Sequence, residues 1–255
     1  ASGVKPIIGM EGYYVPIGSR FDRAPFSFGA EVGQDVGDEG TVKGKVNYTH
    51  MTLLAEDNEG LHNLFRISSL ASLEGQYRKY PRFDRDLLDK HGKGIIATTG
   101  CPSGEVNRWL QVGQYEKARG AAADYRDILG RDNFYCELMD HGIEIERRTR
   151  ADLLRLAKDL GLPLLASNDL HYTHAADAES HEVLLCVQTG KTMADPKRFK
   201  FDARDFYLKS AVEMRTLWAE HPEACDNTLL VAERCNVDFT EGRHLMPRFP
   251  VPAGE

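Results

Sequence analysis

The sequence predicts an α/β fold, because short apolar runs alternate along the chain with amphipathic helical segments. Repeated strand–helix units favour parallel strands joined by right-handed crossovers. This pattern fits an open doubly wound sheet and a barrel equally well, so it does not distinguish between the two folds. With 255 residues the chain is long enough to bury a full core. The runs expected to be buried strands are 6–10, 50–55, 94–99, 134–139 and 162–167.

Helical segments between these runs carry apolar residues at three-to-four spacing. The first begins after Asp57, a residue suited to capping a helix, and the third ends at Gly161, a natural stop. Further helices are expected near 176–187, 211–221 and 223–235. The faces expected to be buried are Leu61, Leu64, Phe65 and Ala71 in the first helix, Tyr115, Ala118, Ala122, Tyr125 and Leu129 in the second, and Leu153, Leu156, Ala157 and Leu160 in the third.

Two segments break the pattern. Residues 18–47 are rich in Gly, Asp and Lys with little periodicity, which predicts an insertion or loop. Residues 246–252 contain three prolines and cannot continue a helix, which predicts an extended linker.

Composition excludes several classes of protein. A net charge of −7 argues against nucleic-acid binding over the whole surface, so any contact with DNA must be local. The five cysteines form no CxxC pair, so neither a disulfide framework nor a zinc ribbon is expected, and a cytoplasmic location fits best. No apolar run approaches the roughly 20 residues that span a membrane. One basic cluster is either a local phosphate contact or a solvated loop, and consists of Lys191, Lys197, Arg198 and Lys200.

The strongest candidate site follows the run 162–167, where Asp169 and His171 lie two residues apart. At strand spacing their side chains point the same way. A carboxylate and an imidazole at the C-terminal end of a barrel strand are typical metal ligands. The alternative is an Asp that caps a loop beside a His packed on Tyr172.

Three further residues occupy comparable positions. Cys101 lies in a tight turn between a strand and a helix, where it is a zinc ligand, a nucleophile or, equally, a small buried thiol. Glu11 follows the run 6–10, although alone it reads as a surface carboxylate. His50 opens its strand, so it reaches the site only if that strand is reversed or the preceding loop folds over. His141 is expected to play a supporting or loop role.

Five motifs taken together resemble, in order and spacing, the PHP (polymerase and histidinol phosphatase) domain of bacterial DNA polymerase III alpha subunits. They cover nearly the whole chain and are 4–11, 48–50, 99–105, 168–172 and 184–191, with 206–210 in addition. The resemblance implies an incomplete distorted (β/α)7 barrel. It divides the chain into a PHP domain at 1–210, its helical end at 211–240 and a linker toward a polymerase palm at 241–255.

The same resemblance implies a cluster of up to three divalent ions, with zinc favoured and manganese or magnesium as alternatives. The ligands implied are Glu11, His50, Cys101, Asp169 and His171. The family's His-x-His and Thr-Asp-His-Gly motifs are expected before Gly3, so the chain is expected to be a fragment with an incomplete cluster and weak or absent catalysis.

The resemblance implies a metal-dependent 3′–5′ exonuclease that removes mismatched nucleotides, within a DNA-directed DNA polymerase. The expected partners are primer–template DNA and other replicase subunits such as the sliding clamp. Two alternatives are a non-catalytic scaffold of the replicase and a small-molecule phosphoesterase.

Overall fold

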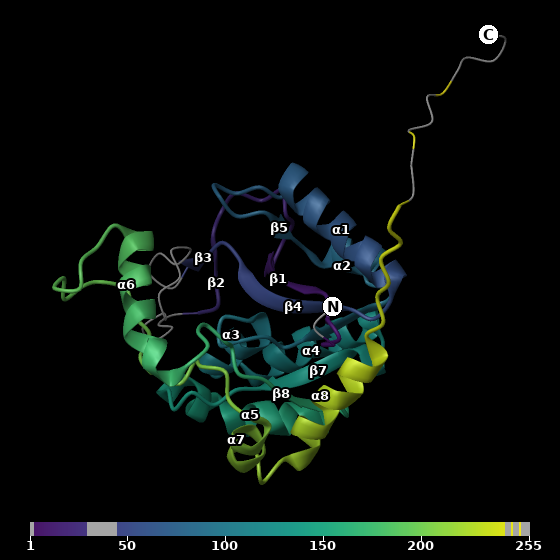
Figure 1. Ribbon diagram of the computed structural model, residues 1–255. Coiled ribbons are helices and arrows are strands. Elements are labelled where there is room, and N and C mark those ends of the chain that lie inside the picture. Colours follow the sequence, from purple (N-terminus) through teal and green to yellow (C-terminus); the bar gives the residue numbers. More distant parts are fainter. Residues whose placement is uncertain (1–2, 30–44, 243–245, 247–249, 251–255) are drawn as a thin grey trace.

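The computed structural model describes residues 3–29, 45–242, 246 and 250 of the chain. Residues 30–44 of the predicted insertion and most of the predicted linker at 246–252 lie outside this part. The centre of the fold is a six-stranded sheet with the order β5-β1-β4-β6-β7-β8 (Figure 1). Its strands are β1 (Gly9–Tyr14), β4 (Thr49–Ala55), β5 (Arg82–Phe83), β6 (Ile95–Thr98), β7 (Phe134–Leu138) and β8 (Leu164–Ala166), and a separate pair is formed by β2 (Phe26–Ser27) and β3 (Lys45–Val46).

Strand β4 runs opposite to both of its neighbours, because it pairs antiparallel with β1 and with β6. The pairs β1–β5, β6–β7 and β7–β8 are parallel. The prediction of parallel strands is therefore correct for most of the sheet and wrong for β4. A parallel pair needs a crossover, usually a helix, whereas the described residues between β1 and β4 hold only β2 and β3. The mostly parallel α/β arrangement agrees with the expected distorted barrel.

The predicted helices are present with small shifts at their ends. Asp57 caps α1 by accepting a hydrogen bond from the backbone N–H of Gly60 at 2.8 Å. Gly161 ends α5 in the left-handed conformation, with φ +63°. The expected buried faces are confirmed except for Phe65, which is 54% exposed, and Tyr115, which is only partly buried. The helices are α1 (Asn58–Leu73), α2 (Arg85–His91), α3 (Glu105–Gln111), α4 (Tyr115–Leu129), α5 (Glu144–Leu160), α6 (Ala178–Thr189), α7 (Ala211–Leu217) and α8 (Pro222–Arg234).

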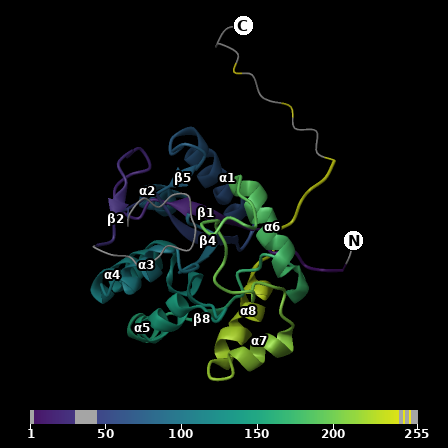
Figure 2. The same cartoon turned by 90° about the vertical axis from the view of Figure 1, so that its left-hand side faces the viewer.

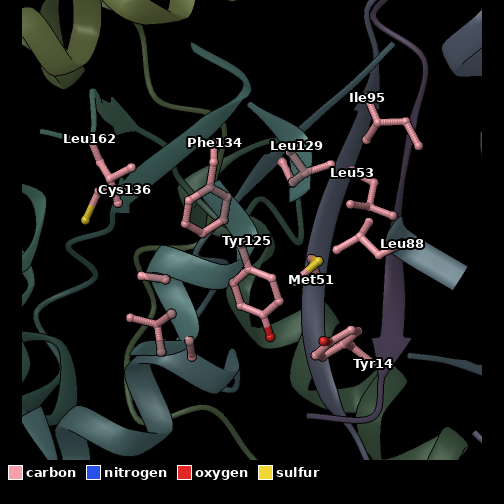
Figure 3. Packing of buried hydrophobic residues seen from close by; sticks show 14 of the residues in the cluster. Tyr14, Met51, Leu53, Leu88, Ile95, Tyr125, Leu129, Phe134, Cys136 and Leu162 are labelled. Carbon is pink, nitrogen blue, oxygen red and sulfur yellow. The ribbon is translucent and has the colours of Figure 1, made fainter. Parts of the chain in front are cut away.

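One face of β4 packs in the apolar core, and only the side chains of the other face remain available to form a site. Figure 3 shows Met51 and Leu53 of this strand in one cluster with Tyr14 of β1 and Tyr125 of α4. Every second residue of β4, from Thr49 to Ala55, is buried. Because side chains alternate between the two faces of a strand, His50 faces away from this core.

Helix α6 stands apart from α4 and α5 in both views of the molecule (Figures 1 and 2). Helix α8 lies beside β8, where the side chain of Asn227 donates a hydrogen bond to the carbonyl oxygen of Leu164 at 2.7 Å. Among the described residues, no helix combines the length and apolar character needed to cross a membrane.

The first turn of α1 packs so closely on the loop before β6 that a methyl group at Gly60 would overlap the carbonyl oxygen of Gly94. We expect Gly60→Ala to lower the free energy of unfolding by about 3 kcal/mol, the upper end for overpacking. Gly120 is a matched control in α4, since a methyl group there meets nothing within 4 Å. Gly120→Ala should raise the free energy of unfolding by up to about 1 kcal/mol. Urea denaturation measures both, and equal stability of the two variants would contradict this packing.

Candidate metal centre

The pairing of β1 with β4 places Glu11 and His50 on the same face of the sheet. His50 is directly opposite Tyr13, and Glu11 lies two residues from Tyr13 along β1. The Nδ1 atom of His50 is 3.0 Å from Oε1 of Glu11. The position predicted for Glu11 is wrong in one respect. It lies inside β1 and not after it, because the strand begins at Gly9 and continues through Tyr14.

The reversed direction of β4 brings His50 to the site. Since β4 runs antiparallel to β6, its first residues lie at the end where β6 finishes and the turn containing Cys101 begins. That turn crosses the start of β4, where the backbone N–H of His50 donates a hydrogen bond to the carbonyl oxygen of Ser103 at 3.2 Å. Of the two arrangements predicted to bring His50 to the site, the structure has the reversed strand.

The side chain of Asn107 fixes the turn by donating hydrogen bonds to the carbonyl oxygens of Gly100 and Cys101, each at 3.0 Å. The sulfur of Cys101 then lies 3.5 Å from Nδ1 of His50 and 4.0 Å from Oε1 of Glu11. All three potential ligand atoms fall within 4.8 Å of one another. A carboxylate, an imidazole and a thiol at these separations are able to share one cation.

Asp169 and His171 line the same pocket as these three residues. They do not continue a strand, because β8 ends at Ala166 and Asp169 has the left-handed φ of +35°. The argument from strand spacing is therefore wrong, although Nε2 of His171 lies 3.5 Å from Oδ1 of Asp169. All five predicted ligands thus meet in one pocket, with Glu11, His50 and Cys101 as its compact set.

The electrostatics of the pocket favour a bound cation. Burial raises the pKa of the Cys101 thiol, the hydrogen bond with His50 lowers it only in part, and the charges of Asp169 and Glu11 raise it further. A raised pKa disfavours a free thiolate nucleophile, so the nucleophile alternative loses support. A cation in contact with the sulfur would instead stabilise the thiolate. The donor set of Glu11, His50 and Cys101 therefore fits a divalent metal.

Asp169 is kept ionised by its surroundings. Burial alone would raise the pKa of this carboxyl, but the hydrogen bond and the electrostatic interaction with His171 lower it below its ordinary range. Glu137 of β7 shows the opposite effect, since burial raises its pKa and the nearby charges of Asp169 and Glu11 add to the rise. Asp169 therefore contributes negative charge to the pocket, whereas burial favours the neutral form of Glu137.

A buried pair, His141 and Glu146, supports the loop that carries Asp169. Nδ1 of His141 lies 2.7 Å from the Glu146 carboxylate, and Nε2 lies 2.8 Å from the carbonyl oxygen of Asn168. The ring of His141 also stacks on Phe206 at 4.1 Å between centroids. The supporting role predicted for His141 agrees with this geometry. Its partner Glu146 was not predicted, because the first turn of α5 shows only an ordinary run of charges.

We expect the contribution of this pair to stability to fall as pH rises. Burial lowers the pKa of His141, but the hydrogen bond and charge of Glu146 outweigh burial and raise it above the ordinary value of about 6.5. A raised pKa in the folded state adds stability that is complete below the ordinary value and is lost as pH rises through the folded value. The difference in unfolding free energy between wild type and His141→Phe should therefore be larger at about pH 5.5 than at about pH 8.5, which lie roughly one unit below and two units above the ordinary pKa of histidine. A difference that grows with pH would contradict the assignment.

Most of the remaining lining of the pocket is aromatic or aliphatic, and none of these residues was predicted to be part of a site. His181 of α6 was not among the predicted site residues, yet its ring centroid lies 5.4 Å from that of His171. Most of these residues reach the pocket from α6 and the segment after it, and Ile143 reaches it from the start of α5, so their spacing along the chain gives no sign of the pocket. This part of the lining includes Ile143, Leu184, Leu185, Phe199, Phe201 and Phe206, together with the amide side chain of Gln188.

The four basic residues proposed to contact DNA divide into two pairs. Lys191 pairs with Asp195 at 3.1 Å, and Arg198 pairs with Glu182 at 2.6 Å. Lys197 and Lys200 are exposed and have no ion-pair partner among the residues that the structure describes.

The chain resembles proteins of a known family. The PHP domain family matches residues 1–141. The DNA polymerase III subunit alpha of Mycobacterium tuberculosis is 52% identical over 99% of this chain and 21% of its own length. The corresponding subunits of Saccharopolyspora erythraea and Deinococcus radiodurans are 56% and 42% identical, over 100% and 98% of this chain. The chain spans about a fifth of the length of these curated relatives.

Proposed function

This chain belongs to the PHP domain family, and from that premise we propose that it is the metal-binding nuclease domain of a replicative DNA polymerase. The proposed reaction is hydrolysis of the last phosphodiester at the 3′ end of a primer. One observation carries the proposal, namely that all five predicted ligands line a single pocket. The names of the relatives supply the substrate, since each is a DNA polymerase III subunit alpha.

Glu11, His50 and Cys101 would hold the cation, while His171 orients the ionised carboxylate of Asp169 toward the same pocket. A bound divalent ion lowers the pKa of water and offsets charge on the phosphate. The protein's own contribution is to place the donors before substrate arrives. The turn held by Asn107 fixes Cys101, and the pair His141–Glu146 fixes the loop of Asp169. The proposed ion is zinc, and carboxylates also admit manganese or magnesium.

The remaining assignments follow from the proposed parent protein. Residues 1–210 would form the PHP domain, 211–240 its helical end and 241–255 a linker toward a polymerase palm. Lys197 and Lys200 are the proposed contacts with DNA phosphates, with Lys191 and Arg198 beside them. Primer–template DNA and other replicase subunits such as the sliding clamp are the proposed partners, and the cytoplasm is the proposed location.

The test uses the full-length protein that contains this chain, loaded with zinc and offered a primer with a mismatched 3′ nucleotide. We expect release of the terminal nucleotide, its loss on chelation, and its loss in His50→Ala. His62→Ala is the matched control, because His62 is exposed on α1 and lies outside the pocket. A protein that binds zinc and leaves the mismatched primer intact would exclude the nuclease and favour a scaffold.

A further inference from the structure

The pocket that holds the five predicted ligands has two chemically different walls. One wall carries carboxylate, imidazole and thiol groups that suit a cation and, through it, a phosphate. The adjoining wall is mainly apolar and aromatic, and includes Phe199, Phe201 and Leu184. A ligand that fills such a pocket carries an anionic group and, next to it, a flat apolar ring.

Phe201 is the centre of the aromatic wall. Its ring lies 4.7 Å from that of His171 in an edge-to-face arrangement and 4.7 Å from that of Phe206. Phe199 extends the wall at 5.6 Å from Phe201. Phe206 is buried, whereas Phe199 and Phe201 are only partly buried. The wall therefore begins at a predicted metal ligand and continues outward.

The segment that carries these rings is fixed in place before any ligand binds. Arg198 and Arg204 both pair with Glu182 of α6, at 2.6 and 3.0 Å. The backbone N–H of His171 donates a hydrogen bond to the carbonyl oxygen of Phe206 at 2.9 Å. A stacking surface that is already ordered loses little entropy when a ring binds on it.

We propose that Phe199 and Phe201 form a stacking subsite for the terminal nucleobase of single-stranded DNA, adjacent to the metal centre. This proposal rests on the proposed function and names the part of the substrate that the apolar wall takes. Aromatic rings stack any of the bases, which suits an enzyme that must accept whichever nucleotide was misincorporated. Gln188, exposed on the same pocket, offers a donor and an acceptor to the edge of the base.

The experiment compares the affinity of the zinc-loaded full-length protein for two oligonucleotides that differ only in their 3′ residue, one normal and one abasic. A phosphorothioate at the last linkage slows cleavage of both during the measurement. We expect the wild type to bind the oligonucleotide with the terminal base about tenfold more tightly. Phe201→Leu and Phe199→Leu keep apolar volume but remove the aromatic face, so each should reduce this ratio to about twofold.

Phe65→Leu is the matched control, since Phe65 is exposed on α1 away from the pocket, and it should keep the tenfold ratio. If Phe201→Leu disturbs metal binding, Phe199→Leu becomes the variant that tests the subsite, because Phe199 contacts Phe201 and no predicted ligand ring. Equal affinity of the wild type for both oligonucleotides, or a full preference in Phe199→Leu, would overturn the subsite. Cleavage of an unmodified primer is scored separately, so a base preference without cleavage rejects only the nuclease, and cleavage without a base preference rejects only the subsite.

Discussion

Replacing Cys101 with alanine is expected to weaken zinc binding by at least about 100-fold. Removing a residue that only supports a metal ligand already costs up to about 100-fold in affinity, and Cys101 is itself a proposed ligand. The reason is geometric. The sulfur of Cys101 lies within reach of both His50 and Glu11, at 3.5 and 4.0 Å, and it is the only thiol among the described residues that lines the pocket. Competition with a chromophoric chelator measures the affinity, and substitution by cobalt reports the thiolate bond through its charge-transfer absorption.

Cys225→Ala is the matched control for this change. Cys225 is a free, buried cysteine on α8, where its thiol donates a hydrogen bond to the carbonyl oxygen of Met214. Both variants remove one thiol, but only Cys101→Ala removes a donor from the pocket. If the two variants bind zinc equally well, Cys101 is a structural thiol and the proposed metal centre is wrong.

Replacing His141 with phenylalanine is expected to reduce both stability and metal affinity. The aromatic ring can still stack on Phe206, but the Glu146 carboxylate loses its imidazole partner and the carbonyl oxygen of Asn168 loses its donor. Breaking a buried charged pair costs about 3–5 kcal/mol. We expect about 3 kcal/mol here, because Glu146 still accepts the backbone N–H of residue 141 at 2.7 Å. Zinc should bind about 10- to 100-fold more weakly, since Asp169 is no longer held in place.

Urea denaturation of the metal-free variant gives the first quantity, and a zinc titration below the unfolding transition gives the second. His62→Phe makes the same chemical change at an exposed position on α1 and should alter neither. A His141→Phe protein that loses stability but binds zinc like the wild type would show that the pair supports the fold and does not position Asp169.

Local signals in the sequence predicted the individual elements of the fold well. Asp57 and Gly161 mark the ends of α1 and α5 because capping depends on neighbouring residues only. The direction of β4 depends instead on what connects it to β1. An apolar run reads the same in either direction, so its periodicity carries no information about whether a strand is reversed.

The five candidate ligands could be named from the sequence, whereas their geometry could not. The turn around Cys101 and the loop after β8 were both expected to carry ligands, and the structure brings them to one pocket. Glu11 was placed at the wrong point of its strand because the start of β1 depends on pairing with β4. The left-handed backbone of Asp169 is held by tertiary contacts of its loop, and no local pattern predicts those contacts. His181 and Phe201 were missed for the same reason.

The most direct test of the metal centre is anomalous diffraction at the zinc edge from crystals of the zinc-loaded protein. We expect a peak among the side chains of Glu11, His50 and Cys101, with the sulfur about 2.3 Å from the ion. Asp169 and His171 should face the same density or that of a neighbouring ion. A peak bound by other residues, or none in this pocket at saturating zinc, would contradict the account.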